Sequence, residues 1–238
     1  MNDAFAALAA DLLVLLPQGD AGAHAGAPAG AHAGAHAGAH AGAHAGAHDG
    51  AHDGAHILRV WANARRIAAE EGGDGDILAA AVLLHDCVHV EKSSPLRGQA
   101  SRLAAARAAE LLASRGWEAA RIARVAHAIA AHSFSAGIAP ETLEARVLQD
   151  ADRLDAIGYI GIARCFYTAG RMGSALYHPA DPQAGDRPLD DRNFALDHFR
   201  AKLLKLSDGF QTATGARMAV ERTLVLAEFV AGFEAEIA

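Results

Sequence analysis

The stretch from Ile77 to Leu84 reads ILAAAVLL and is followed at once by His85 and Asp86. An unbroken apolar run leaves no polar face, which predicts a helix packed on all sides at the centre of the molecule. An imidazole and a carboxylate directly after it are unexpected, because burying a charged group without a partner costs several kcal/mol. A divalent cation is a sufficient partner. The alternative is a helix end that has already reached solvent.

The composition of the 238-residue chain favours helices and fits a single main domain. Of its residues 52% are hydrophobic, yet only 5% are aromatic and alanine dominates, a mixture that suits helices better than strands. The formal charge of −7 argues against a nucleic-acid polymer as a partner. A small anion is still an acceptable substrate, because a local group of cations or a metal ion outweighs the global charge.

The cysteines and the N-terminus bear on the compartment. Cys87 and Cys165 are too far apart for a CxxC or zinc-finger spacing and are predicted to be reduced thiols. The apolar stretch from Phe5 to Leu16 lacks a basic start, since the first Lys or Arg of the chain is Arg59. No apolar run approaches the length of a membrane-spanning helix. We therefore expect a cytoplasmic protein without a membrane partner.

The other patterned segments predict an all-α fold, a compact helical bundle. Amphipathic patterns with start and stop signals indicate helices at 3–16, 57–71, 94–114, 117–132, 141–169, 194–206 and 214–237. No segment alternates as a strand does. A polar loop, residues 173–193, either closes over a substrate or is a solvated connection. Asp197 and His198 follow this loop and are expected to position it.

Residues 21–56 are a tetrapeptide array, mostly Ala-Gly-Ala-His. Frequent glycine and the lack of bulky apolar side chains keep such a segment from offsetting its ordering entropy by burial. We predict a disordered Ala/Gly/His-rich insert, which divides the chain into an N-terminal helix (1–18), a repeat tether (19–51) and a globular domain (52–238). The array histidines can also hold transition metals loosely, so metal storage is the alternative to a repeat expansion without function.

Further metal-binding side chains lie on two other predicted helices. His56 begins the helix before the apolar run, one step from its apolar stripe, and is expected to point inward. Asp150, Asp152 and Asp155 interrupt an otherwise apolar stretch, 147–162. A histidine, a His-Asp pair and a distant aspartate on buried helices form the ligand set of a hard-to-borderline metal ion.

This order, H…HD…D on a helical chain, resembles the HD phosphohydrolase superfamily. Several segments resemble its small bacterial YedJ/YpgQ-like branch, and their joint order is more specific than any one of them. They are His52–His56 with Arg59 and Val60, Leu83–Asp86, Lys92–Pro95, His132–Ser135, Asp150–Ala156, Asp197–Phe199 and Lys202–Leu206. The resemblance implies that 52–238 is an HD phosphohydrolase domain with the helical HD-domain bundle.

The resemblance also implies a divalent metal ion and its ligands. The ligands carried over residue by residue are His56, His85, Asp86 and Asp152. Asp152 is chosen because Ala151–Leu154 reproduces the Ala-Asp-Arg-Leu context of the family's last ligand. Asp150 and Asp155 remain alternatives or supporting groups. The ion would be Mn²⁺, Mg²⁺, Co²⁺, Fe²⁺ or Zn²⁺, with Mn²⁺ favoured.

Polar side chains after the apolar run are candidates for a catalytic role beside Asp86. Lys92 would neutralise a phosphate oxygen, or is a solvated cation at the end of a helix. His89 lies one turn after His85 and would donate a proton, or caps the helix. Cys87 points elsewhere around the helix and is predicted to pack.

The predicted helix at 117–132 carries two histidines that we interpret differently. His132 shares a stripe with Ile122, Val125 and Ile129, so it is expected to point with the apolar side chains and to reach the site. His127 falls off that stripe and is expected in solvent.

The resemblance implies hydrolysis of a phosphomonoester, a phosphodiester or a nucleoside triphosphate by a water that the metal ion activates. For this branch it suggests a nucleotide, with pyrophosphate as the product. A zinc peptidase is the alternative enzyme, because His85 and His89 are four residues apart, but Asp86 stands where that motif needs glutamate. The alternative without catalysis is a His-rich metal-binding or regulatory protein that works through the array.

Overall fold

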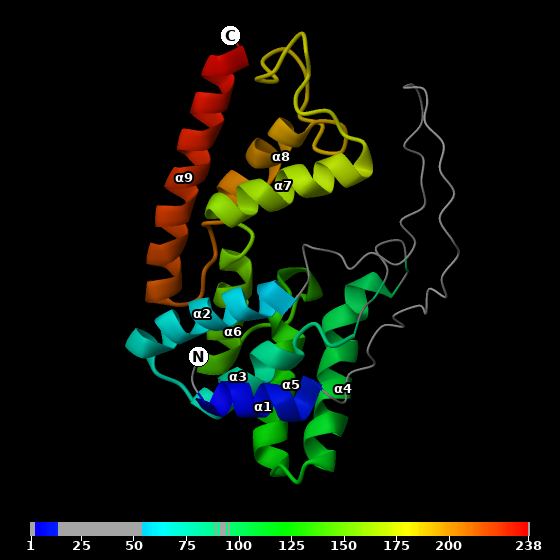
Figure 1. Cartoon of the computed structure of the whole chain (residues 1–238), viewed down its shortest axis with the longest axis vertical. Coiled ribbons are helices and arrows are strands. Elements are labelled where there is room, and N and C mark those ends of the chain that lie inside the picture. Colours follow the sequence, from blue (N-terminus) through cyan, green and yellow to red (C-terminus); the bar gives the residue numbers. More distant parts are fainter. Residues whose placement is uncertain (1–2, 14–53, 89, 91–93, 95, 238) are drawn as a thin grey trace, which may run out of the picture.

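A computed structural model describes residues 3–13, 54–88, 90, 94 and 96–237, which fold into helices joined by loops (Figure 1). The predicted all-α class is confirmed. The helices are α1 (Asp3–Leu13), α2 (Gly54–Glu71), α3 (Gly75–Leu84), α4 (Ala100–Ser114), α5 (Ala119–His132), α6 (Leu143–Leu154), α7 (Gly158–Met172), α8 (Ala195–Ala201) and α9 (Ala213–Ile237). Short 3-10 helices are η1 (Arg97–Gln99), η2 (Phe134–Ala136) and η3 (Leu203–Lys205).

Helix α3 is the central element that the apolar run predicts. Every residue from Ile77 to Leu84 is buried, and the helix contacts α1, α2, α4, α5 and α6. The side chain of Asp74 caps its N-terminus by accepting hydrogen bonds from the amides of Asp76 and Ile77. The helix ends at Leu84. His85 follows directly, so its position is fixed by the packing of the core around α3.

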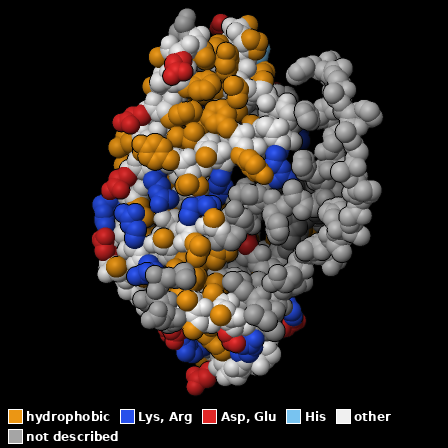
Figure 2. All heavy atoms as spheres, viewed as in Figure 1, with side chains coloured by type: hydrophobic (Ala, Val, Ile, Leu, Met, Phe, Trp, Pro, Cys, Tyr) orange, Lys and Arg blue, Asp and Glu red, His pale blue; other side chains and the backbone are white. Residues whose placement is uncertain are grey.

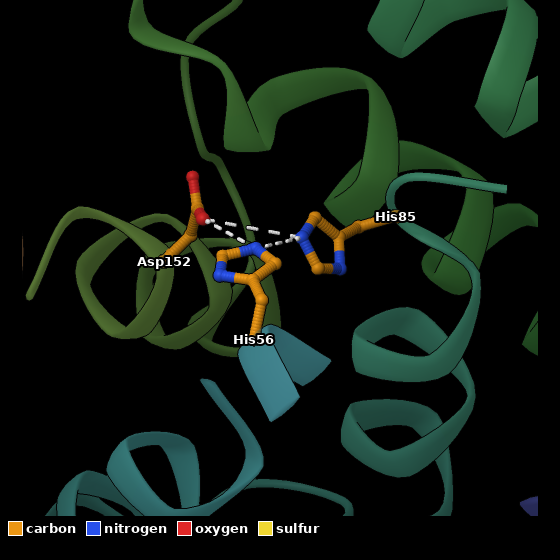
Figure 3. A group of neighbouring side chains, drawn as sticks. All are labelled: His56, His85 and Asp152. Atoms are coloured by element: carbon orange, nitrogen blue, oxygen red, sulfur yellow. Dashed lines mark hydrogen bonds and ion pairs between the residues drawn. The ribbon is translucent and has the colours of Figure 1, made fainter. Parts of the chain in front are cut away.

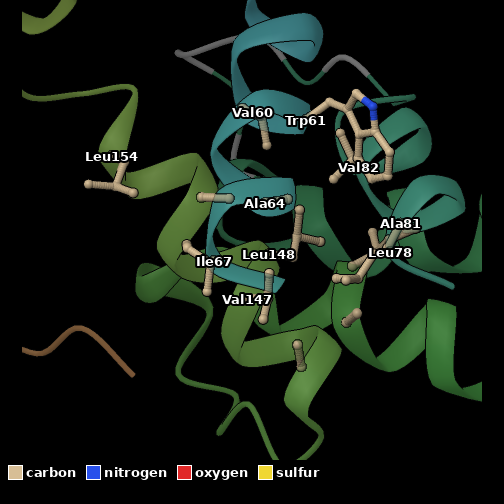
Figure 4. Close-up of a cluster of buried hydrophobic side chains, with 14 of the residues drawn as sticks. Val60, Trp61, Ala64, Ile67, Leu78, Ala81, Val82, Val147, Leu148 and Leu154 are labelled. Atoms are coloured by element: carbon tan, nitrogen blue, oxygen red, sulfur yellow. The ribbon is translucent and has the colours of Figure 1, made fainter. Parts of the chain in front are cut away.

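Helices α2 and α6 pack against each other in opposite directions. Val60, Ala64 and Ile67 recur at four- and three-residue steps on α2 and are fully buried. They face Val147 and Leu148 of α6 in one apolar cluster (Figure 4). Burial of each large aliphatic side chain contributes about 1.5–3 kcal/mol to this packing. The start of α2 is therefore held beside the end of α6.

The prediction of one helix over 141–169 is wrong, because the chain breaks between α6 and α7. Gly158 has φ +74, a left-handed conformation that side chains with a Cβ rarely adopt, and Ile157 before it is extended. Gly161 is needed as well, since a Cβ there would lie 2.3 Å from the carbonyl oxygen of Ala156. The break leaves Asp155 at the end of α6 as a buried residue, 1% exposed.

Helices α7, α8 and α9 form the other half of the molecule (upper part of Figure 1). Phenylalanine rings join them, with Phe166 of α7 5.8 Å from both Phe199 of α8 and Phe229 of α9, measured between ring centroids. Hydrophobic side chains are also prominent on the outside of this half (Figure 2). This half stacks over α2 and α6.

Two further predicted boundaries differ from the structure. Helix α4 begins at Ala100 and not at Ser94, because Ser94 accepts a hydrogen bond from the amide of Leu96 in a turn and η1 intervenes. The segment predicted as one helix at 194–206 is α8 followed by η3. The break falls at Lys202 (φ −134), which lets Leu203 enter the core.

The repeat array up to residue 53 and residues 14–16 of the first predicted helix lie outside the described residues, so the predicted domain boundaries remain predictions. Within the described part of the chain, none of the helices combines the length and apolarity that crossing a bilayer requires.

Candidate metal centre

His56, His85 and Asp152 meet where three helices begin or end (Figure 3). His56 lies in the first turn of α2, His85 caps the C-terminus of α3, and Asp152 lies in the last turn of α6. The Nε2 atom of His56 is 3.3 Å from Nε2 of His85 and 3.4 Å from Oδ1 of Asp152. Both imidazoles are 1% exposed, so the cluster is fixed by the packing of α2, α3 and α6.

Asp86 and His132 extend this cluster toward solvent. Oδ2 of Asp86 is 3.6 Å from Nε2 of His85 and 3.8 Å from Nε2 of His56. On its other side, Oδ1 of Asp86 is 3.9 Å from Nε2 of His132, the last residue of α5. The Asp86 side chain is 40% exposed, whereas His132 is buried. The cluster is therefore open where Asp86 lies.

Hydrogen bonds at the outer ring nitrogens orient the histidines. Nδ1 of His85 donates to the carbonyl oxygen of Val82 at 2.8 Å, and Nδ1 of His132 donates to that of Ile129 at 2.6 Å. A backbone carbonyl only accepts, so in the neutral rings the proton resides on Nδ1 and the Nε2 lone pair points into the cluster. This is the tautomer that a metal ligand requires.

His56 is oriented by a carboxylate. Its Nδ1 is 2.8 Å from Oδ2 of Asp155, the residue left buried by the break after α6. Asp155 is held in turn by Arg59, whose Nε is 2.6 Å from Oδ1, and by Arg164 of α7, whose guanidinium is 2.8 Å from Oδ2. A carboxylate behind a ligating histidine fixes the ring and makes it a stronger ligand.

The cluster perturbs the proton affinities of its members in opposite directions. Burial lowers the pKa of His56, but its contacts with Asp152 and Asp155 outweigh burial and raise the pKa to about 9. Burial lowers the pKa of His85, and the nearby His132 and His56 act in the same direction. Burial raises the pKa of Asp155, but the hydrogen bonds from His56 and Arg59 bring the pKa down to about 2. Without a metal ion, a proton on His56 balances the carboxylates.

The donor set fits one divalent cation. Ligand atoms about 2.1 Å from a single ion lie roughly 3.0–3.4 Å from each other in octahedral or tetrahedral geometry. The distances from Nε2 of His56 to His85 and Asp152 are 3.3 and 3.4 Å, whereas His85 and Asp152 are 3.9 Å apart and Asp86 is 3.6 and 3.8 Å from the two histidines, so a small inward shift of the carboxylates completes the site. Imidazole and carboxylate donors together suit Mn²⁺, Fe²⁺, Co²⁺ or Zn²⁺.

Comparison with known proteins agrees with this geometry. The profile of the HD domain matches residues 54–157, which contain the whole cluster. The protein YpgQ of Bacillus subtilis (strain 168), described as uncharacterized, is 34% identical over 185 residues that span 76% of this chain and 82% of YpgQ. The chain belongs to the HD superfamily. It is a metal-dependent phosphohydrolase of that superfamily.

Solved HD structures have the same fold. A crystal structure of Bacillus subtilis YpgQ in complex with ADP superposes with a TM-score of 0.61 at 34% identity and covers 78% of this chain and 86% of that one. An HD-superfamily hydrolase from Bacillus thuringiensis gives a TM-score of 0.60 at 32% identity, with the same coverage of both chains. The fold is therefore shared along most of this chain.

The structure gives the three aspartates near the end of α6 different roles. Asp152 faces the two histidines, and Asp155 lies behind His56. Asp150 points away and accepts hydrogen bonds from the amides of Gln211 and Thr212, which anchors the start of α9. These roles follow from the helical period, because Asp150 and Asp152 are two residues apart and lie on different faces, whereas Asp152 and Asp155 are three apart and both reach His56.

The remaining predicted residues are divided. His132 reaches the cluster of ligand side chains, whereas His127 lies outside it and is partly exposed, with Nε2 accepting a hydrogen bond from the amide of Glu141. Cys87 packs against the core, as predicted, and contacts the carbonyl oxygen of Ala104. His89 and Lys92 lie outside the described residues, so their roles remain predictions.

The peptidase alternative does not fit the HD fold. A helical zinc motif needs both histidines on one continuous helix. Helix α3 ends at Leu84, and Cys87 and Val88 are already outside any helix.

Sequence reasoning missed the two arginines that hold Asp155. Arg59 lies one turn after His56 on α2, and that spacing was a usable signal. Arg164 approaches from α7 only because the chain turns at Gly158, and a continuous helix over 141–169 hides this contact.

Proposed function

We propose that this protein hydrolyses a nucleotide at the cluster formed by His56, His85, Asp86 and Asp152. The observation that carries the proposal is the meeting of His56, His85 and Asp152, with Asp86 3.6 Å from His85, in a chain of the HD superfamily. The ADP complex of Bacillus subtilis YpgQ, 34% identical to this chain, supports a nucleotide as the substrate class.

In this proposal His56, His85, Asp86 and Asp152 hold the divalent ion, and Mn²⁺ is favoured. When bound, such an ion supplies a Lewis acid for the phosphoryl group and lowers the pKa of the attacking water. The buried histidines supply fixed nitrogen donors, and the more exposed Asp86 marks the side from which the substrate arrives. The packing of α2, α3 and α6 positions the ligands before the substrate binds, so no free energy is spent on arranging them during the reaction.

His132 is placed to act on the substrate. Its Nδ1 is engaged by the carbonyl oxygen of Ile129, which leaves Nε2 facing the open side of the cluster next to Asp86. A protonated His132 would donate a hydrogen bond to a phosphate oxygen or a proton to the leaving group. Lys92 and His89, which lie outside the described residues, are proposed to balance phosphate charge on the sequence argument alone.

A release assay tests the proposal. The purified protein is stripped with a chelator, reloaded with Mn²⁺, Mg²⁺, Co²⁺, Fe²⁺ or Zn²⁺ in turn, and offered nucleoside mono-, di- and triphosphates while phosphate and pyrophosphate are measured. We expect no turnover after chelation, recovery with Mn²⁺, and no cleavage of casein. Release of neither product from any nucleotide under any metal would contradict the proposal.

A further inference from the structure

A cleft of about 600 Å³ lies between α7, α8 and the end of the 173–193 loop. We name it the α7–α8 cleft. The cleft is lined by five charged residues, Arg97, Arg164, Asp191, Arg192 and Lys202, and by His198. Ala169, Ala195 and Leu203 contribute an apolar part of the wall. A cleft of this size accommodates a small molecule such as a nucleotide.

The charge of the cleft is opposite to that of the whole protein. The chain carries a formal charge of −7, but the lining combines four Lys or Arg side chains with the single carboxylate of Asp191. Cations gathered along a concave surface concentrate the field and attract an anion. Within the described residues, the cleft thus supplies a local group of cations of the kind that attracts an anionic substrate.

Two of these cations are engaged in ion pairs, Arg164 with Asp155 and Lys202 with Asp191, which leaves Arg97 and Arg192 as the unpaired cations of the cleft within the described residues. Asp191 is shared by Lys202, whose Nζ is 2.6 Å from Oδ2, and by His198, whose Nδ1 is 3.2 Å from the same atom. The side chains of Arg97 and Arg192 are exposed and make no hydrogen bond or ion pair within the part of the chain that the structure describes. Their guanidinium groups are available to a ligand.

The loop end that brings Asp191 and Arg192 to the cleft is anchored. Asp197 at the start of α8 is fully buried, and its carboxylate accepts hydrogen bonds from the guanidinium of Arg187 and from the amide of Asp190, the latter at 2.7 Å. The expectation that Asp197 positions the loop agrees with these contacts. Arg192 is therefore presented from a fixed backbone.

Arg164 connects the cleft to the metal centre. It lines the cleft, and its guanidinium donates to Oδ2 of Asp155, the atom that also contacts Nδ1 of His56. Ala156, which follows Asp155 in the chain, lines the cleft as well. The two sites are thus linked through Asp155, whose carboxylate contacts both His56 of the metal centre and Arg164 of the cleft wall.

We propose that the α7–α8 cleft binds an anionic group of the substrate other than the one that is hydrolysed, with Arg192, Arg97 and Lys202 as specificity-determining residues. The inference rests on the proposed function, and it selects, among nucleotides, those with a further phosphate beyond the reacting one. Arginine supplies paired N–H donors that match phosphate oxygens, and such charge-assisted hydrogen bonds are about twice as strong as neutral ones.

The experiment compares Arg192→Gln and Lys202→Gln with wild type and with Arg65→Gln. Arg65 is an exposed arginine on α2 outside the cleft, so its variant removes the same charge without touching the lining. For the hydrolysed nucleotide we expect KM to rise about tenfold in the two cleft variants, the loss that one charge-assisted contact at a solvated site gives, with kcat nearly unchanged. Arg65→Gln should match wild type.

Calorimetry with inorganic pyrophosphate on the full-length, metal-loaded protein provides a readout that does not need turnover. We expect the pyrophosphate Kd to weaken about tenfold in Arg192→Gln and to be unchanged in Arg65→Gln. Wild-type KM and wild-type pyrophosphate affinity in both cleft variants would overturn the inference while leaving nucleotide hydrolysis intact. Arg192-dependent pyrophosphate binding in a protein that hydrolyses no nucleotide would instead overturn the proposed function and leave the cleft as an anion site.

Discussion

The metal centre and the α7–α8 cleft hold their polar groups in opposite ways. In the metal centre, His56 and His85 are buried, and the outer nitrogen of each ring is bonded to a carboxylate or a carbonyl. In the cleft, Arg97 and Arg192 are exposed and unpaired within the described chain, and Lys202 is 61% exposed. In the metal centre, the surrounding hydrogen bonds fix both the orientation and the tautomer of the ligand rings. In the cleft, the charges are carried by exposed side chains that can change conformation.

The difference follows from what each site has to do. Metal-assisted chemistry needs ligands held within a fraction of an ångström, so every atom behind them matters. Recognition of a second anionic group needs charge of the right sign in the right region, and solvated cations provide it with little structural demand. Substitutions in the metal centre should therefore cost far more than substitutions in the cleft.

The largest effect is expected from removing a ligand. His85→Ala or Asp86→Asn should lower turnover and metal affinity by more than about 100-fold, beyond the 10–100-fold that loss of a supporting residue costs, because the ion loses a bond. Helical content by circular dichroism should stay near wild type, and His127→Ala is the matched histidine control outside the cluster. Full activity in either metal-analysed ligand variant would show that the reaction does not use this cluster.

A smaller effect is expected behind the ligands. Asp155→Asn should weaken Mn²⁺ binding by about 10–100-fold, because His56 loses the carboxylate that orients its ring. It should also destabilise the fold by about 3 kcal/mol or more, since Arg59 and Arg164 lose their shared partner. Titration calorimetry gives the first quantity and chemical denaturation the second.

Asp150→Asn is the control for that prediction. Asp150 is also buried on α6 but bonds to the start of α9, so its variant should be less stable while metal affinity is retained. Equal loss of metal affinity in both aspartate variants would indicate a general loosening of α6 and not a specific role of Asp155.

The pH dependence of metal binding should be intermediate in size. Without metal, the pKa of His56 is raised to about 9, so below that pH the ring carries a proton that a metal ion must displace. Metal affinity is therefore expected to rise by about tenfold per pH unit between pH 7 and pH 8, the direction opposite to proton binding. Calorimetry in buffers of different ionisation enthalpy should detect close to one released proton, and affinity that is independent of pH would argue against a protonated His56.

The smallest effect is expected from the repeat array. Deleting residues 21–47 should leave turnover within a few-fold, because an array histidine lacks the helical frame that holds His56. His56→Ala should abolish turnover even though His52 is four residues away. Activity and metal retained in His56→Ala would show that His52 replaces it, and loss of activity on deleting 21–47 would show that the array is a working part of the protein.

Local patterns carried much of the fold and of the candidate site. The apolar run at 77–84 predicted the central helix, and the stripe through Val60 and Ala64 predicted that His56 points inward. The order H…HD…D identified the superfamily. The error over 141–169 arose because helical periodicity continues across the break, while the left-handed turn at Gly158 and the close approach of Gly161 to Ala156 are features that no periodicity reports.

The sequence by itself determined the helical class, the buried centre at α3 and the residue types available to a metal ion, because periodicity and charge are local properties of the chain. Only the tertiary structure decided among the aspartates of α6, where Asp152 faces the histidines, Asp155 supports His56 and Asp150 bonds to α9. Likewise, only the turn after α6 brings Arg164 to Asp155 and so links the wall of the cationic cleft to the metal centre. These assignments depend on how helices distant in sequence pack together, and the physical reason is geometric: a difference of two residues rotates a side chain to another face, and the neighbouring helices determine what it meets there.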